Sequence, residues 1–497
     1  MAAQSYDEFI DHVKRFSNVE HAVHILNWDQ QVMMPEGGTP ARSQQVSTLS
    51  TLHHELLTSE ETETYLSALE SSSLTDEQSA VVREIRRQYE RADRVPSELV
   101  EEIAHTTSSA LPVWKEAKEN DDFEAFAPTL SKLVDLKREY AEQIDPDADP
   151  YAVLFAEYEP YLGLDTAERV LERLRNRLVD LIESIEQSDV ALETDAFSGT
   201  YPADEQEALC RSALDRLGYP WEHGRLDTAP HPFSTGSQFD ARVTTRFTED
   251  DPIDALTSTI HEFGHAMYTL GLPREQYGTP LGQNRNLSVH ESQSRLWENH
   301  VGRSRSFWEQ FLPAVTERFP ETSGVSPRAA YEAANQVYPD NLIRVEADEL
   351  TYHLHIVLRF EIEQQLIHGE IDVEEVPHVW NEKMEEYLGV RPDTDSAGCL
   401  QDIHWTHGSF GYFPTYSLGS VLAAQLYATA TQEIEALDEQ IQNGEFSALQ
   451  EWLTDNVHQH GQRYTTPDLI EHATGEPLTA DYFLDYAERK YGALYEL

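Results

Sequence analysis

Two histidines and a glutamate stand at the spacing that a catalytic metal requires. Residues 261–265 read HEFGH, so His261 and His265 are four residues apart and Glu262 lies between them. On a helix, residues four apart share one face, so both imidazoles can reach a single ion. Glu262 points to an adjacent face, where it can bond a metal-bound water. The spacing predicts the HExxH site of a zinc hydrolase, and the alternative is a chance match of ordinary surface or core histidines.

The segment around this motif carries the signals of a helix. Asp251 can cap its start, Pro252 fits its first turn, and Gly271 fits just past its end. Apolar residues recur at spacings of three and four, which predicts a buried stripe that fixes the helix in a core. They are Ile253, Leu256, Ile260, Phe263, Met267 and Leu270.

A catalytic zinc needs a third protein ligand, usually a carboxylate on a following helix. Glu291 follows His265 within a predicted helix, and the glycines between them allow that helix to fold back beside the first. Glu298 is the rival ligand, and spacing alone does not decide between the two. His290 is a weaker candidate because it points to a different face from Glu291.

Such a site constrains the reaction. The metal would lower the pKa of a bound water and polarise a carbonyl. Glu262 would take the proton of that water and deliver it to the leaving amine. The predicted reaction is hydrolysis of an amide, most simply a peptide bond.

The elements around the site are predicted to be mostly helical, with a small β element just before the metal helix. The clearest strand signal covers residues 237–247, which alternate and include β-branched side chains. Helical periodicity is found over 5–26, 40–57, 75–93, 97–119, 123–143, 165–187, 204–217, 285–303, 328–337, 346–368, 373–388, 417–441 and 478–492.

The 497 residues include 90 acidic and 36 basic ones, which gives a formal net charge of −54. An acidic surface of this kind keeps a protein soluble in concentrated salt, so we expect an extreme halophile as host. The same charge argues against nucleic acid and anionic membranes as partners.

No long apolar run or cationic leader is present, so we expect a cytosolic protein. Cys210 and Cys399 read as reduced thiols rather than a disulfide framework.

Several motifs in one order resemble the M32 family of metallocarboxypeptidases (thermostable carboxypeptidase 1 type), over nearly the whole chain. The residues that carry the resemblance are LNWD at 26–29, MPEGG at 34–38, HPF at 231–233, DARVT at 240–244, the HExxH motif, HESQ at 290–293, IRVEAD at 343–348 and GCLQDIHW at 398–405.

The resemblance implies a mostly helical fold around a deep groove, related to neurolysin and the angiotensin-converting enzymes. It implies one domain, in which residues 1–200 form a groove wall and residues 201–497 hold the metal site. It also implies a homodimer that removes single residues from peptides with a free C-terminus, with broad specificity. The metal would be Zn²⁺ or Co²⁺, and Glu291 would be the third ligand.

One position departs from thermolysin-like sites. There, an Asp four residues after the ligand Glu orients a metal histidine, whereas this chain has Arg295. Support for the histidines must therefore come from elsewhere. Asp240 and Asp402 are the candidates.

An exopeptidase must also bind the free carboxylate of its substrate, which a guanidinium does best. Arg344 is the candidate, and the alternative is a surface ion pair with Glu346 or Asp348. Arg242 is a candidate for lining the substrate path, and His231 for binding substrate backbone or carboxylate. A similar His…Gly-Tyr…Tyr run in neurolysin-like enzymes supplies donors to the tetrahedral intermediate. By that similarity the transition-state stabilisers here are His407 and Tyr412, with Tyr416 in reserve.

Two other functions remain open from the sequence. One is an endo-acting oligopeptidase of the neurolysin type, which would cleave peptides whose C-terminal carboxylate is blocked. The other is a non-catalytic, peptide-binding helical protein with a degenerate metal site. Intact Glu262 argues against the second, because a pure binder needs no general base.

Overall fold

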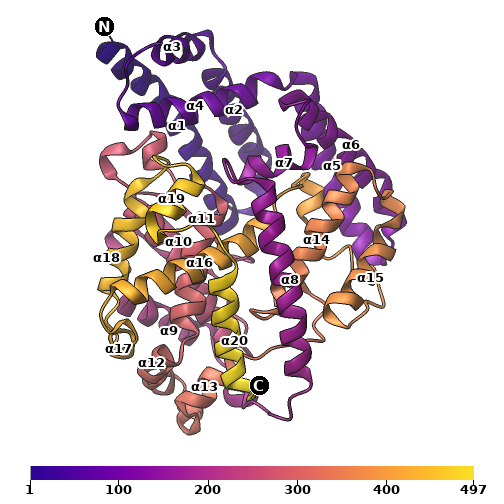
Figure 1. Ribbon diagram of the computed structural model, residues 1–497, viewed down its shortest axis with the longest axis vertical. Helices are drawn as coiled ribbons and strands as arrows, with labels where there is room; N and C mark the ends of the chain where they lie inside the picture. The colour runs from indigo at the N-terminus through magenta and orange to yellow at the C-terminus, as the bar shows by residue number, and fades with distance from the viewer. Residues whose placement is uncertain (1) are drawn as a thin grey trace.

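The fold is built almost entirely from helices, as predicted. The computed structural model describes residues 2–497, with side chains from residue 5 onward. Figure 1 shows the indigo N-terminal helices at one end of the molecule and the later helices below them. The α-helices are α1 (Ala2–Val32), α2 (Thr39–Leu57), α3 (Glu60–Glu70), α4 (Asp76–Arg94), α5 (Ser97–Asn120), α6 (Phe123–Ile144), α7 (Pro150–Tyr158), α8 (Leu164–Glu186), α9 (Ala203–Leu217), α10 (Pro252–Gly271), α11 (Leu287–Arg295), α12 (Arg305–Arg318), α13 (Pro327–Ala333), α14 (Thr351–His368), α15 (Val376–Leu388), α16 (Pro414–Glu433), α17 (Leu437–Gln442), α18 (Ser447–Asn456), α19 (Thr466–Thr474) and α20 (Asp481–Tyr495).

Helix α10 carries the HExxH motif and is framed as the sequence predicts. The Asp251 carboxylate accepts from the backbone N–H groups of Ile253 and Asp254, which caps the helix. Gly271 is the last helical residue rather than the first one beyond the helix. Leu256, Ile260 and Phe263 of the predicted stripe are buried, and the other three members are half-buried against the same core.

The β element is a hairpin with a third strand beside it. The strand predicted over 237–247 is confirmed over Asp240–Thr245, whereas Ser237 ends the preceding strand and a turn lies between the two. The strands β1 (Leu226–Thr228), β2 (Ser234–Ser237) and β3 (Asp240–Thr245) lie in the order β1-β3-β2. β3 pairs with β1 in parallel and with β2 antiparallel, and it packs on α10. The turn between β2 and β3 is anchored by Gln238, whose buried amide donates to the carbonyl of Gly282. The contact that holds this turn comes from a residue 44 positions further along the chain, so local alternation does not reveal it.

Two predicted helices are divided in the structure. The segment 285–303 begins as α11 and continues as a π-helical stretch over Leu296–Gly302. The segment 417–441 ends as α16 at Glu433 and restarts as α17, after Ala436 adopts a left-handed backbone with φ 55°. Five helices went unpredicted, namely α3, α7, α12, α18 and α19.

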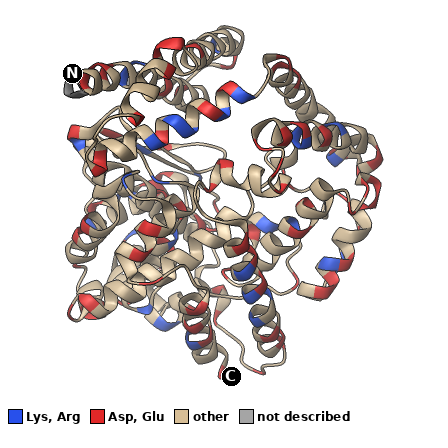
Figure 2. Cartoon of the chain, turned by 45° about the horizontal axis from the view of Figure 1, so that its top comes forward, with Lys and Arg blue, Asp and Glu red and all other residues tan. Residues whose placement is uncertain are grey.

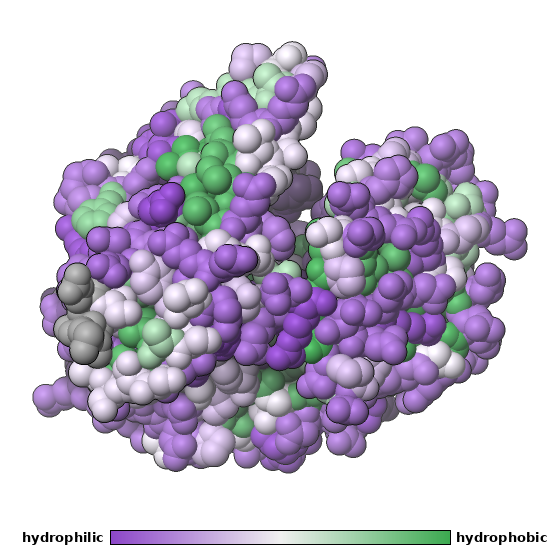
Figure 3. All heavy atoms as spheres, turned by 90° about the horizontal axis from the view of Figure 1, so that it is seen from above, coloured by the Kyte–Doolittle hydropathy of each residue, from purple (hydrophilic) through white to green (hydrophobic). Residues whose placement is uncertain are grey.

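The described chain has two hydrophobic cores. A small one is formed by α1–α4 together with Leu281, and a large one includes the metal helix and the remaining helices. Between the N-terminal helices α1, α4 and α7 and the elements α10, α11 and β2 lies a cavity of about 600 Å³. Seen from above, the surface is split by a deep cleft (Figure 3).

Acidic residues are spread over helices all around the molecule, and basic residues are fewer (Figure 2). None of the described helices combines the length and the apolar character that a membrane crossing needs.

Candidate metal centre and active site

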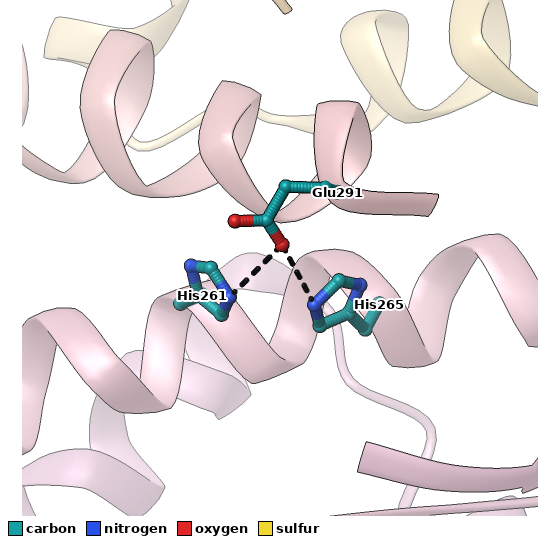
Figure 4. A group of neighbouring side chains, drawn as sticks. All are labelled: His261, His265 and Glu291. Atoms are coloured by element: carbon teal, nitrogen blue, oxygen red, sulfur yellow. Dashed lines mark ion pairs between the residues drawn. The ribbon is translucent and has the colours of Figure 1, made fainter. Parts of the chain in front are cut away.

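His261, His265 and Glu291 converge on one point (Figure 4). Glu291 Oε2 lies 3.6 Å from His261 Nε2 and 3.4 Å from His265 Nε2. The two histidines project from α10 and the glutamate from α11, which crosses above it. Within the described chain, this is the one group of three or more potential metal ligands that lie within 4.8 Å of one another.

The Nδ1 atoms of His261 and His265, which point away from Glu291, are hydrogen-bonded to acceptors. Nδ1 of His261 lies 2.9 Å from Glu298 Oε2, and Nδ1 of His265 lies 3.0 Å from the carbonyl oxygen of His290. A carboxylate and a carbonyl can only accept, so both Nδ1 atoms carry the proton. The two Nε2 atoms, which face the Glu291 carboxylate, are therefore the nitrogens available to a metal. Two imidazole nitrogens and one carboxylate oxygen form the ligand set of a catalytic zinc, so the residues fit a divalent metal.

The groups that orient the histidines are not the predicted ones. Asp240 is paired with Arg242 at 2.6 Å, and Asp402 is paired with Arg344 and Arg359 at 2.7 and 2.6 Å. Both aspartates are thus occupied by arginines. Glu298, considered from the sequence as a rival ligand, instead accepts a hydrogen bond from Nδ1 of His261, on the side of the ring opposite Glu291.

Arg295 and Arg303 hold the two carboxylates in place. Arg295 donates to Glu291 Oε1 at 2.8 Å and to Glu298 Oε2 at 3.2 Å, while Arg303 binds Glu298 Oε1 at 3.1 Å. Arg295 thus donates to Oε1 of Glu291, the oxygen that does not face the histidines. Burial would raise the pKa of Glu291, but Arg295 and the histidines hold it well below its usual range. Glu291 is therefore an ionised carboxylate, the form in which it can bind a metal.

Glycines let the helices approach closely enough to form the site. A Cβ on Gly264, within the HExxH motif, would lie 2.4 Å from the backbone oxygen of Gln293 on α11. A Cβ on Gly419 of α16 would lie 2.6 Å from Cβ of Glu291. Helix α11 is therefore held between α10 and α16, with a glycine at each crossing.

Glu262 is buried beside the cluster and is 5% exposed. Among the described residues its Oε2 atom has no hydrogen-bond partner. Burial raises the pKa of Glu262, and the neighbouring histidines oppose that change. A buried carboxylate with a free oxygen and a raised pKa has the properties of a general base. The ring of His290, the weaker candidate ligand, instead stacks on His265 with ring centroids 4.3 Å apart.

Arg344 is buried, at 6% exposure, and lies among aromatic rings. Its Nε and Nη2 atoms donate to Asp402 Oδ1, and neither Glu346 nor Asp348 is its partner. Its guanidinium lies 5.4 Å from the ring centre of Tyr416 and 5.9 Å from that of Tyr352.

Tyr412 and Tyr416 lie beside the metal cluster. Their ring centroids are 5.3 Å apart, and the Tyr416 hydroxyl lies 3.3 Å from Nε2 of His404. Burial raises the pKa of both tyrosines, and the Glu291 carboxylate adds to the effect. They are therefore neutral O–H donors at physiological pH.

Of the other candidates from the sequence, two are exposed and one is bound to an aspartate. His407 is exposed at the end of a 3-10 turn and, within the described chain, forms no hydrogen bond or ion pair. His231 is exposed in the loop before β2. Arg242 is bound to Asp240 and stacks 4.2 Å from the ring centre of Trp28. The sequence did not identify the supporting roles of Glu298 and Arg295, although Glu298 lies two helical turns after Glu291 and so on the same side.

Comparison with known proteins agrees with this geometry. The family described as "Carboxypeptidase Taq (M32) metallopeptidase" matches residues 8–491. "Thermostable carboxypeptidase 1" of Thermus thermophilus is 40% identical over 95% of this chain and 95% of its own. "Carboxypeptidase 1" of Bacillus subtilis is 35% identical over the full length of both chains. The crystal structure of the M32 carboxypeptidase from Deinococcus radiodurans R1 is 37% identical, covers 99% of this chain and 100% of its own, and superposes with a TM-score of 0.96. This chain belongs to the M32 family of metallocarboxypeptidases.

Proposed function

We propose that this metallocarboxypeptidase removes the C-terminal residue from peptides that carry a free carboxylate, with broad specificity. The observation that carries the proposal is the convergence of His261, His265 and Glu291 beside a buried Glu262 with one unpaired oxygen. This arrangement stands in a chain that matches named carboxypeptidases over nearly its full length.

Zn²⁺ or Co²⁺ is the proposed metal, with His261, His265 and Glu291 as its ligands. When bound, the metal supplies a Lewis acid and a water of lowered pKa. The ligand set of two imidazoles and one carboxylate supports this choice over Mg²⁺ or Ca²⁺, which prefer oxygen ligands.

Glu262 is the proposed general base and then the general acid. Its unpaired Oε2 takes a proton from the attacking water and returns it to the leaving amine. Tyr412 and His407 are proposed to donate to the developing oxyanion, with Tyr416 as a further donor. The neutral, buried hydroxyls of Tyr412 and Tyr416 support this role, and His407 would have to turn inward to take part.

Arg344 is the proposed receptor for the substrate carboxylate. Nε and Nη2 are engaged by Asp402, which leaves Nη1, 3.3 Å from the Tyr352 hydroxyl, as the donor available to a substrate. His231 and Arg242 are proposed to contact the substrate path. Residues 1–200 would form one wall of the groove, in keeping with the cavity between α1, α4 and α7 and the metal helix.

Three properties of the whole protein complete the proposal. It would act as a homodimer in the cytoplasm of a halophilic host, on peptides made by other proteases. The net charge of −54 supports the halophilic setting.

Removing the general base tests the catalytic roles. We expect Glu262→Gln to lower kcat about 10²- to 10⁴-fold and to retain its metal, because an amide cannot take the proton of the water. Activity of the wild type should vanish on chelation and return with Zn²⁺ or Co²⁺. Metal content and peptide hydrolysis are measured on the same samples. A Glu262→Gln variant that hydrolyses at the wild-type rate would contradict the assignment.

A further inference from the structure

Glu363, a buried glutamate on α14, is hydrogen-bonded through both carboxyl oxygens to the loop that leads into Tyr412. Glu363 is fully buried. Its Oε1 accepts from the indole Nε1 of Trp405 at 3.0 Å. Its Oε2 accepts from the backbone N–H of Gly411 at 3.0 Å and from the hydroxyl of Tyr151 at 2.9 Å. One carboxylate thus joins α7, α14 and both ends of the loop 405–411.

The chemistry of these partners demands an acceptor at each oxygen of the carboxyl group. An indole N–H and a backbone N–H can donate but cannot accept, and one of them faces each oxygen of Glu363. Burial raises the pKa of Glu363 to about 7 in spite of these donors and of Arg359, one turn earlier on α14. Burying this group is unfavourable, so the contacts that it makes must offset that cost.

The loop also packs closely against α7. Gly411 has φ 87°, and a Cβ there would lie 2.7 Å from the backbone nitrogen of Phe155. The next residue, Tyr412, packs its ring edge-on against Tyr158 with centroids 5.1 Å apart. The position of Tyr412 is therefore fixed by the contact of the loop with α7 and by the hydrogen bond to Gly411.

Tyr412 is linked to the metal cluster through Tyr416, which lies on α16, the helix whose Gly419 packs against Glu291. Its ring lies 5.3 Å from that of Tyr416, and its pKa is raised by burial and by the Glu291 carboxylate. A shift of the loop would move this hydroxyl relative to the metal ligands. Misplacement by about 1 Å is enough to reduce catalysis about 100-fold.

We propose that Glu363 is a positioning residue that holds Tyr412 in place at the metal cluster through its bonds to Trp405 and Gly411. The inference rests on the proposed role of Tyr412 in stabilising the transition state. Glu363 touches neither the substrate nor the metal, and it acts through the loop.

Glu363→Gln tests this with almost no change in size. A glutamine offers one acceptor oxygen and one NH₂ group. Whichever way it is turned, the NH₂ group faces the N–H of either Trp405 or Gly411 and leaves that donor unpaired. We expect kcat to fall about 10- to 100-fold, with KM changed less than about threefold and metal content unchanged.

A double-mutant cycle separates positioning from general damage. If Glu363 acts through Tyr412, then Glu363→Gln in a Tyr412→Phe background should lower kcat by less than about threefold. The matched control is Glu361→Gln on the same helix, whose carboxylate binds Arg175 and Tyr387 away from the loop. It should leave kcat within about twofold.

Trp405→Phe is the second variant, for use if Glu363→Gln does not fold. It removes the indole N–H donor and leaves the Glu363 carboxyl group intact. It should reproduce the fall in kcat at constant KM and metal content. The inference is overturned if folded Glu363→Gln retains wild-type kcat, if it loses metal in proportion to activity, or if its effect is undiminished in the Tyr412→Phe background. If Tyr412→Phe alone has no effect on kcat, the proposed role of Tyr412 fails instead.

Discussion

At the scale of single residues, the proposed metal ligands are held by a second layer of charged side chains. Glu298 accepts from His261 Nδ1, and Arg295 donates both to Glu298 and to the proposed ligand Glu291. The Asp of thermolysin-like sites lies four residues after the ligand Glu, where this chain has Arg295. The supporting carboxylate has thus moved one turn further along, into the π-helical segment.

Glu298→Gln should weaken metal affinity about 10- to 100-fold. The glutamine can still accept from His261, but it lacks the charge that raises the basicity of the imidazole and balances Arg295 and Arg303. Competition with a metallochromic chelator measures the change. The exposed Glu346→Gln serves as control, and equal affinity in the two variants would show that Glu298 does not support the metal.

At the scale of elements, the site depends on how closely α11 packs between α10 and α16. Gly264→Ala should destabilise the protein by about 1–3 kcal/mol and weaken metal binding, because the added methyl meets the backbone of α11. Thermal unfolding and metal titration measure the two effects. Gly492→Ala on α20 is the matched control, since nothing lies within 4 Å of its added methyl. Unchanged metal affinity in Gly264→Ala would contradict the packing argument.

Helix α11 is also held at its N-terminus by a buried carboxylate. Glu159 accepts from the backbone N–H and the hydroxyl of Ser288 at 2.7 and 2.6 Å, and from the amide of Asn286. Burial nevertheless raises the pKa of Glu159 to about 8. Between the ordinary pKa of a glutamate and this value, the folded protein binds more protons than the unfolded one. The contribution of Glu159 to stability is therefore complete at low pH and is lost as the pH rises towards 8.

We expect the unfolding free energy of the wild type, relative to that of Glu159→Gln, to fall between pH 5 and 8, because the raised pKa of Glu159 sets this range. Buried Glu363, with a pKa of about 7, leaves a residual slope. Denaturant unfolding at several pH values gives the comparison, with the exposed Glu172→Gln as control. The same slope in Glu159→Gln and in the wild type would rule out this source of pH dependence.

Much of this organisation could be predicted from local sequence signals. The cap at Asp251, the HExxH spacing and the apolar stripe define α10, because each depends on residues within a few turns. The hairpin turn at Gln238 and the break before Ala436 were missed, since distant contacts and a left-handed residue decide them. Likewise the supporting roles of Glu298, Arg295 and Glu363 become visible only once α10, α11 and the loop 405–411 lie together.

At the scale of the whole molecule, the charge of −54 is the dominant property. Raising KCl from about 0.1 M to about 2 M should increase the melting temperature, because salt shortens the Debye length from about 10 Å to below 3 Å and screens the self-repulsion. Circular dichroism measures the change, and sucrose at equal osmolality controls for excluded-solute effects. A melting temperature that does not respond to KCl would contradict an electrostatic origin.

The central claim is that this metal site serves an exopeptidase. Its most direct test is a mass-spectrometric time course on one peptide and its C-terminal amide, in molar KCl with Zn²⁺ or Co²⁺. We predict a ladder that loses one residue at a time from the free C-terminus, and no cleavage of the amide or of chelated samples. Internal fragments from both peptides would contradict the account and remove Arg344 from its proposed role.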